Sequence, residues 1–178
     1  MPAHDAVPDL GVPSDQRVDE PPRSFSQELW SHGASTYAAI LQHPFLTGLT
    51  DGTLPRAAFR YFVVQDSHYL RAYARALALV SSRATDPAAV ALFARHASEA
   101  IAVEQDLHGS LLAGLGLDPA DVDRAGSGPS TTAYASYLLA VCATATFAEA
   151  DAAVLPCYWV YRDVGRELSS PSSPDPLY

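Results

Sequence analysis

Apolar side chains recur along the middle of this chain at the spacing of one helix face. A capping box formed by Ser24 and Gln27 predicts a first helix over residues 24–43, and Pro44 is expected to end it. A proline at a first helical position predicts a long second helix over about residues 55–82. The first half of the chain is therefore expected to be helical.

Two further helical segments follow in the second half of the sequence. Asp86-Pro87 repeats the start signal, and the apolar stripe after it predicts a helix over residues 86–114. After a polar loop that contains glycines, a helical pattern covers about residues 131–168, with an interruption expected at 144–147, where β-branched residues crowd. No segment has the pattern of a strand. Long helices joined by short turns predict an all-α bundle.

The two ends of the chain differ from the middle in composition. Residues 1–23 combine several prolines with acidic and small residues, so we expect a disordered N-terminal tail. Residues 169–176 form a second low-complexity stretch, rich in serine and proline. The remainder predicts one helical domain over residues 24–178.

Composition and charge narrow the class of protein. The chain has 178 residues, of which 48% are hydrophobic, enough for one domain with a substantial core. Its formal net charge of −9 repels nucleic-acid phosphates and anionic membrane surfaces, and no apolar run approaches the ~20 residues that cross a bilayer. Two cysteines make no disulfide framework, and no secretion signal opens the chain. We therefore expect a cytoplasmic protein that binds neither nucleic acid nor membrane.

The second predicted helix carries two polar residues on a side that is otherwise apolar. Asp66 and Tyr69 are three positions apart, so both side chains project to the side that also holds Phe62. A carboxylate there needs a partner or a function, and Asp66 is suited to accept from an amino group or a protonated ring nitrogen of a ligand. The alternative is a capped or solvent-facing aspartate. His68 points elsewhere, and we expect a surface or packing role for it.

The third predicted helix contains four residues of metal-binding types. They are His96, Glu99, Glu104 and His108. Di-iron bundles repeat Glu-x-x-His on two helices and add a glutamate from each of two others, whereas this helix has the reverse order and no second copy. A solvated face or interhelical hydrogen bonds therefore explain these residues better than a metal site, and an iron-dependent helical oxygenase is the weaker alternative.

The last helical segment places a cysteine beside a proline and among aromatic residues. Cys157 and Tyr161 lie at i and i+4 on one face, and Pro156 is expected to kink the helix because it lacks an N–H. Polar backbone exposed by such a kink favours a lowered thiol pKa and a nucleophile in a ring-binding pocket. The alternative is a small buried filler, in which case Tyr134 and Tyr161 are core or interface aromatics.

These features belong to motifs that occur together in this sequence. The motifs are Asp51–Pro55, Phe59–Leu70, Thr132–Tyr134, Phe147–Ala150 and Leu155–Gly165, with shorter matches at His43–Phe45 and Leu107–His108. Their combination resembles the TenA or thiaminase II family, the aminopyrimidine aminohydrolases. The pairing of QDxxYL with LPCxWxY is highly specific, and the resemblance covers residues 24–178.

The resemblance implies a helical fold like that of haem oxygenase, without haem, metal or another cofactor, in a homo-oligomer that is a tetramer or a dimer. It also implies hydrolysis of thiamin or of the salvage compound 4-amino-5-aminomethyl-2-methylpyrimidine. Within that family pattern, Cys157 matches the nucleophile that adds to the pyrimidine ring, and Asp66 matches the carboxylate that binds the ring nitrogens. Tyr69, Tyr134 and Tyr161 match aromatic pocket residues that orient the substrate and the nucleophile.

The sequence departs from the family pattern in two places. In the family, two more helices follow the turn that Pro176–Tyr178 resembles, and they supply a glutamate acid/base, a phenylalanine and another tyrosine, so we expect a bundle truncated at its C-terminus. Asp151 stands where the family commonly has an apolar residue. Three hypotheses follow: an aminopyrimidine hydrolase, a non-catalytic aminopyrimidine-binding or interaction module, and a fragment completed by helices of a partner.

Overall fold

The computed structural model describes residues 23–168, apart from the side chains of Glu104 and of residues 106–110. The predicted N-terminal tail, except for Arg23, and the serine- and proline-rich stretch near the C-terminus therefore lie outside the described residues. The turn expected at Pro176–Tyr178 lies outside them as well.

The chain divides into two compact units, Met1–Ser35 and Thr36–Tyr178. The described part of the first unit contains the start of α1 (Phe25–Leu41). There the Ser24 N–H donates to Gln27 Oε1 at 2.8 Å, and the Gln27 N–H donates to Ser24 Oγ at 3.4 Å. These reciprocal bonds satisfy two N–H groups that a helix start leaves without partners, so the predicted capping box is confirmed.

The second unit contains the remaining helices, and the all-α prediction is confirmed for the described residues, which include no strand. The helices are α2 (Pro44–Asp51), α3 (Arg56–Arg83), α4 (Pro87–Gly114), α5 (Pro119–Ala125), α6 (Pro129–Thr144) and α7 (Phe147–Leu168). The interruption predicted near residues 144–147 is confirmed as the short connection between α6 and α7.

Two short helices, α2 and α5, were missed by the sequence analysis. Pro44 was predicted to stop a helix, but it also begins α2, whose first turn is capped by His43 Nδ1 accepting from the Phe45 N–H at 3.1 Å. In α5, the Asp118 side chain accepts from the Ala120 N–H at 2.7 Å, which caps a segment interpreted as loop. Local caps stabilise these short helices, which contain too few residues to show a repeating pattern of apolar positions in the sequence.

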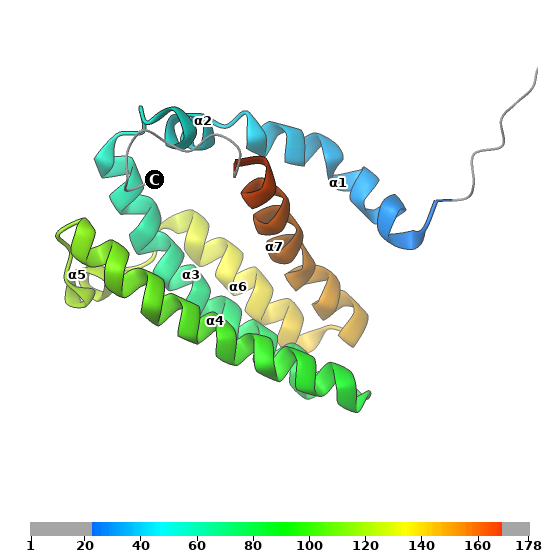
Figure 1. Cartoon of the computed structure of the whole chain (residues 1–178). Helices are drawn as coiled ribbons and strands as arrows, with labels where there is room; N and C mark the ends of the chain where they lie inside the picture. Colours follow the sequence, from blue (N-terminus) through cyan, green and yellow to red (C-terminus); the bar gives the residue numbers. More distant parts are fainter. Residues whose placement is uncertain (1–22, 169–178) are drawn as a thin grey trace, which may run out of the picture. The chain divides into compact units, whose positions relative to one another are not determined.

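Helix α3 packs against α4, α6 and α7, which lie around it in Figure 1. Apolar side chains of all four helices form one core cluster. Its buried members are Tyr73, Ala76, Leu77, Val80, Phe93, Leu138, Cys142, Ala150, Ala153 and Val154. Leu77 and Leu138 are almost fully buried, and each such side chain contributes about 1.5–3 kcal/mol to folding. This core fixes the faces of α3, α6 and α7 that carry the predicted site residues.

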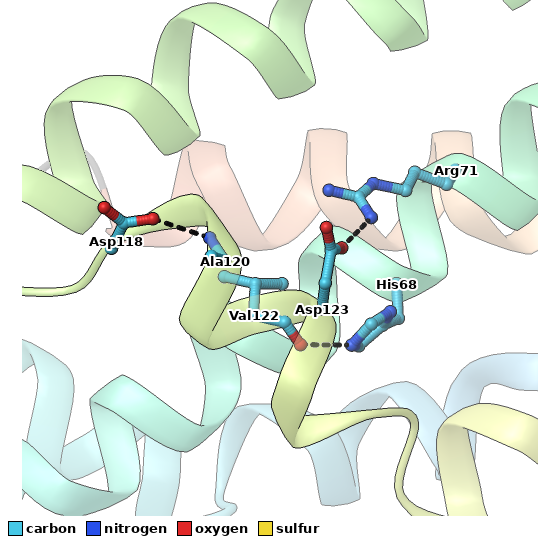
Figure 2. A network of polar contacts seen from close by, with 6 residues as sticks. All are labelled: His68, Arg71, Asp118, Ala120, Val122 and Asp123. Atoms are coloured by element: carbon cyan, nitrogen blue, oxygen red, sulfur yellow. Dashed lines mark hydrogen bonds and ion pairs between the residues drawn. The ribbon is translucent and has the colours of Figure 1, made fainter.

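Polar contacts hold α5 against α3 (Figure 2). Arg71 Nη1 and Asp123 Oδ1 form an ion pair at 2.8 Å, and His68 Nε2 lies 3.1 Å from the Val122 carbonyl oxygen. His68 thus has the packing role predicted for it, on a part of α3 that faces α5. The Val122 side chain is buried in a second apolar cluster, so α5 is anchored by both polar and apolar contacts.

Candidate active site

A cavity of about 550 Å³ lies among α1, α3, α6 and α7 in the second unit. Small-molecule sites typically enclose about 300–1,000 Å³, so this volume suits a small ligand. The lining residues are Thr36, Ile40, Phe62, Gln65, Asp66, Tyr69, Ser130, Thr131, Tyr134, Pro156, Cys157, Val160 and Tyr161. All five residues singled out in the sequence, Asp66, Tyr69, Tyr134, Cys157 and Tyr161, are among them.

Asp66 is the only lining residue, among those described, that carries a full charge at neutral pH in its usual ionisation state. It reaches the cavity together with Tyr69 because residues three apart share one side of a helix. The Tyr161 hydroxyl of α7 donates to Asp66 Oδ1 at 3.2 Å. This bond links α7 to α3 and orients the carboxylate, whose oxygens can accept further hydrogen bonds from a ligand.

Tyrosine rings from α3 and α6 form an aromatic wall. The rings of Tyr69 and Tyr134 are stacked, with centroids 5.6 Å apart and planes 13° apart. Tyr73, one helical turn after Tyr69, lies behind it with a centroid distance of 5.5 Å. Stacked aromatic faces favour a flat, electron-poor ring as the ligand, because such a ring can extend the stack.

Cys157 lies on α7 beside Pro156 and lines the cavity, and the hydroxyls of Tyr69 and Tyr73 are among the groups that affect the pKa of its thiol. Burial raises the pKa of its thiol above the ordinary value, the two tyrosine hydrogen bonds act in the opposite direction, and the charge of Asp66 raises it further. The lowered pKa expected from the sequence was therefore wrong. A thiolate needs a compensating charge or strong donors, and no cation lines the described part of the cavity.

Burial also keeps the surrounding phenols protonated. It raises the pKa of Tyr69 and of Tyr73, and in both cases the neighbouring Cys157 adds to the effect. Burial raises the pKa of Tyr161 too, with the carboxylate of Asp66 as the next cause. These hydroxyls are therefore hydrogen-bond donors at neutral pH: that of Tyr73 donates to the Val154 carbonyl at 3.0 Å, and that of Tyr161 donates to the carboxylate of Asp66.

The possible metal ligands on α4 have other contacts. His96 Nδ1 lies 2.8 Å from the Tyr158 hydroxyl, and Glu99 pairs with Arg95 at 3.6 Å. No group of three potential ligands comes together among the residues that the structure describes. The side chains of Glu104 and His108 lie outside them. Interhelical hydrogen bonding, one of the two interpretations preferred for these residues, is confirmed for His96.

Gln65 is a lining residue to which the sequence analysis gave no role. Its Nε2 donates to the Gly126 carbonyl at 3.1 Å, and its Oε1 accepts from the Gly128 N–H at 2.7 Å. These two bonds fix the connection between α5 and α6, and so the start of the helix that carries Tyr134. In the sequence, the glycines of this loop could have marked the connection as a special one. Their partner Gln65, however, lies on α3, far from them in the sequence.

Gly128→Ala is expected to lower the free energy of unfolding by about 1 kcal/mol. A Cβ at this position lies 2.5 Å from Tyr61 Oη and 3.3 Å from Gln65 Oε1, so the exposed Tyr61 ring must turn away and the Gln65 bonds must loosen. Urea unfolding measures the change. Gly165→Ala is the matched control, because nothing lies within 4 Å of its Cβ, and equal stability of the two variants would contradict the prediction.

Comparison with known proteins relates the chain to one family. The model of the TENA/THI-4/PQQC family matches residues 30–178. The chain is 38% identical over 171 residues to the thiamine biosynthesis multifunctional protein ThiED of Corynebacterium efficiens, covering 94% of this chain and 23% of that protein. It is 36% identical over 156 residues to the aminopyrimidine aminohydrolase of Bacillus subtilis, covering 86% and 65% respectively. The chain thus spans less than two thirds of the length of either relative.

A solved structure agrees with the sequence comparison. The TenA homologue from P. horikoshii OT3 superposes with a TM-score of 0.80 at 30% identity, covering 86% of this chain and 72% of that one. The haem-oxygenase-like helical fold predicted from the resemblance is therefore confirmed. Among the described residues, no helix combines the length and apolar character needed to cross a membrane.

Proposed function

This chain belongs to the TENA/THI-4/PQQC family, and from that premise we propose that it hydrolyses aminopyrimidine compounds in thiamin salvage. The proposed substrates are 4-amino-5-aminomethyl-2-methylpyrimidine and thiamin, and the proposed product is the hydroxymethylpyrimidine. The observation that carries the proposal is one cavity that holds a thiol, a carboxylate and a stacked aromatic wall. Curated relatives named aminopyrimidine aminohydrolase support the substrate class.

In the proposed reaction, Cys157 is the nucleophile. Its sulfur forms a bond to the electron-poor pyrimidine ring as the S–H proton passes to water, and the electron pair then expels the leaving group from the exocyclic carbon. The leaving group is ammonia, which departs with a proton from water, or, in thiamin, the neutral thiazole. Water supplies the hydroxyl group of the product, and the C–S bond breaks to restore the thiol. Dividing one difficult displacement into two steps is the advantage of covalent catalysis.

The other lining residues are proposed to bind and orient the ring. Asp66 accepts hydrogen bonds from the amino group or a protonated ring nitrogen, and Tyr161 holds the carboxylate in place by the bond at 3.2 Å. Tyr69 and Tyr134 stack beside the ring, and Tyr69 also acts to lower the pKa of the Cys157 thiol. Tyr69 is thus proposed to act both on the bound ring and on the nucleophile.

A second candidate function is aminopyrimidine binding without catalysis. The raised pKa of the Cys157 thiol and the absence of a cation from the described lining favour it, because a protonated thiol is a poor nucleophile. Asp66 and the aromatic wall serve a binding protein as well as an enzyme.

The test is product formation by the purified 178-residue chain from each of the two compounds, followed by chromatography, together with calorimetric titration. We expect the hydroxymethylpyrimidine from at least one compound. Binding without product would move the assignment to the second candidate, and neither binding nor product in a folded protein would contradict both.

We also propose that the protein works in the cytoplasm as a homo-oligomer. Large aromatic side chains at the surface support self-association, among them Tyr137, which is 55% exposed on α6. Light scattering of the purified chain tests this proposal, and a monomer at micromolar concentrations would contradict it.

A further inference from the structure

Helix α6 contributes three residues to the cavity lining, and all of them lie in its first two turns. They are Ser130, Thr131 and Tyr134. Among the described residues of α6, the first buried side chain is that of Leu138, and the N-cap residue Gly128 has no side chain that could cap the helix. The part of α6 that faces the cavity is therefore anchored neither by a buried side chain of its own nor by an N-cap side chain.

Gln65 of α3 supplies the missing anchor. Its Nε2 donates to the Gly126 carbonyl at 3.1 Å, and its Oε1 accepts from the Gly128 N–H at 2.7 Å. The two partners fix the orientation of the amide, because a carbonyl needs the N–H group and an N–H needs the oxygen. Without these bonds, a connection that contains two glycines could adopt several backbone conformations.

Two further residues of α3 hold the same segment, but they do so at α5. His68 Nε2 lies 3.1 Å from the Val122 carbonyl oxygen, and Arg71 Nη1 pairs with Asp123 Oδ1 at 2.8 Å (Figure 2). Neither His68 nor Arg71 is among the described residues that line the cavity. Of these three contacts, that of Gln65 is the one that lies at the cavity and reaches the start of α6.

We infer that Gln65 is a positioning residue: its two hydrogen bonds hold Tyr134 in its stack with Tyr69 and so set the affinity of the cavity for a flat ring. The two tyrosine rings have centroids 5.6 Å apart and planes 13° apart, and they come from different helices. Their near-parallel arrangement therefore depends on how the start of α6 lies against α3. If the connection before α6 moves, Tyr134 turns out of the stack and a bound ring loses one aromatic face.

The proposed chemistry depends on a different part of the structure. Cys157 lies on α7 and Asp66 on α3, and these helices are joined by the bond from the Tyr161 hydroxyl to Asp66 Oδ1 at 3.2 Å. That bond does not involve the connection between α5 and α6. Loss of the Gln65 contacts should therefore weaken the binding of substrate and of transition state alike, which raises KM and leaves kcat nearly unchanged.

This inference rests on the proposed binding of aminopyrimidines, and its test is calorimetric titration with 4-amino-5-aminomethyl-2-methylpyrimidine. Gln65→Met removes both hydrogen bonds and keeps the length of the side chain. Gly128→Ala disturbs the same contact from the other side, since its Cβ lies 3.3 Å from Gln65 Oε1, and Gly128 is not among the described lining residues. Arg71→Met is the matched control, because it removes a polar contact between α3 and α5 away from the cavity.

We expect the Kd to rise about three- to tenfold in Gln65→Met and about two- to threefold in Gly128→Ala, and to stay unchanged in Arg71→Met. A merely structural role of Gln65 would lower the fraction of folded chains. Calorimetry would then show fewer binding sites per chain at an unchanged Kd. Where product forms, the Gln65→Met variant should show the matching rise in KM with kcat nearly unchanged.

Hydrogen exchange followed by mass spectrometry tests the anchor without a ligand. The Gly128 N–H is bonded to Gln65, and the Thr132 N–H is bonded to the Gly128 carbonyl at 2.9 Å, so a peptide that covers residues 126–134 reports on this contact. We expect the peptide to exchange at least about fivefold faster in Gln65→Met and at an unchanged rate in Arg71→Met.

An unchanged Kd in folded Gln65→Met would overturn the inference. A rise in Gln65→Met beside an unchanged Kd in Gly128→Ala would also overturn it, because Gln65 would then act by touching the ligand. An equal rise in Arg71→Met would do the same, since it would show a general effect of α5 packing. If the unaltered chain binds no aminopyrimidine, the proposed function is contradicted, and exchange decides this inference: an unchanged rate in Gln65→Met overturns it, and a faster rate supports it.

Discussion

Replacing Cys157 by serine is expected to lower aminopyrimidine turnover by at least about 10³-fold, because removal of a catalytic nucleophile can cost up to about 10⁶-fold. Serine has nearly the same size, and its hydroxyl can donate and accept hydrogen bonds at the same position. Its hydroxyl, however, ionises far less readily than a thiol. Chromatographic assay of product under saturating substrate measures the loss.

The second cysteine supplies a matched control for this change. Cys142 is fully buried in the core of α6 and does not line the cavity, so Cys142→Ser makes the same chemical replacement away from the proposed chemistry. That variant should keep most of its turnover once a modest loss of stability is accounted for. Equal rates for the Cys157→Ser variant and the unaltered chain would rule out the cysteine mechanism.

The convergence of the site residues was predictable because it depends on helix spacing. Asp66 and Tyr69 reach the same side of α3, and Cys157 and Tyr161 reach the same side of α7, as intervals of three and four residues require. What the spacing left open was whether those two sides meet. The bond from Tyr161 to Asp66 shows that they do.

The protonation state of the thiol was not predictable from the same pattern. Pro156 pointed to exposed polar backbone and a lowered pKa, but α7 continues through the proline, and the dominant effect on Cys157 is burial. The hydrogen bonds of the core near Cys157 were equally inaccessible to sequence analysis. Tyr73 of α3 donates to the Val154 carbonyl of α7, and the Tyr158 hydroxyl of α7 lies 2.8 Å from His96 Nδ1 of α4, and nothing local in the sequence indicates either contact.

The cavity therefore combines a buried thiol with a negative charge and neutral donors. In the free protein this arrangement disfavours the thiolate, since Asp66 adds to the effect of burial on the pKa. A ligand that is protonated or cationic reverses the balance, because its positive charge would lie between the carboxylate and the sulfur. The site is thus expected to bind such ligands and to activate Cys157 in the same event.

Asp66→Asn is expected to have opposite effects on ligand binding and on the thiol. Binding of an aminopyrimidine should weaken about 10- to 150-fold, since a hydrogen bond to a charged group contributes about 1.5–3 kcal/mol. Alkylation of Cys157 near neutral pH should instead become roughly three- to tenfold faster, because the negative charge that raises the pKa of Cys157 is removed. Calorimetry and iodoacetamide kinetics measure the two effects on one sample.

The opposite signs distinguish electrostatics from a general disturbance of the fold, which would weaken binding but need not follow this pattern. Asp86→Asn is the matched control: Asp86 caps α4 with its side chain, asparagine caps equally well, and the same charge is lost outside the cavity lining. It should leave both measurements unchanged. If Asp66→Asn leaves binding intact, the carboxylate does not hold the ring. If it slows alkylation, the carboxylate does not raise the pKa of the Cys157 thiol. Either result would contradict the proposed coupling between ligand charge and nucleophile.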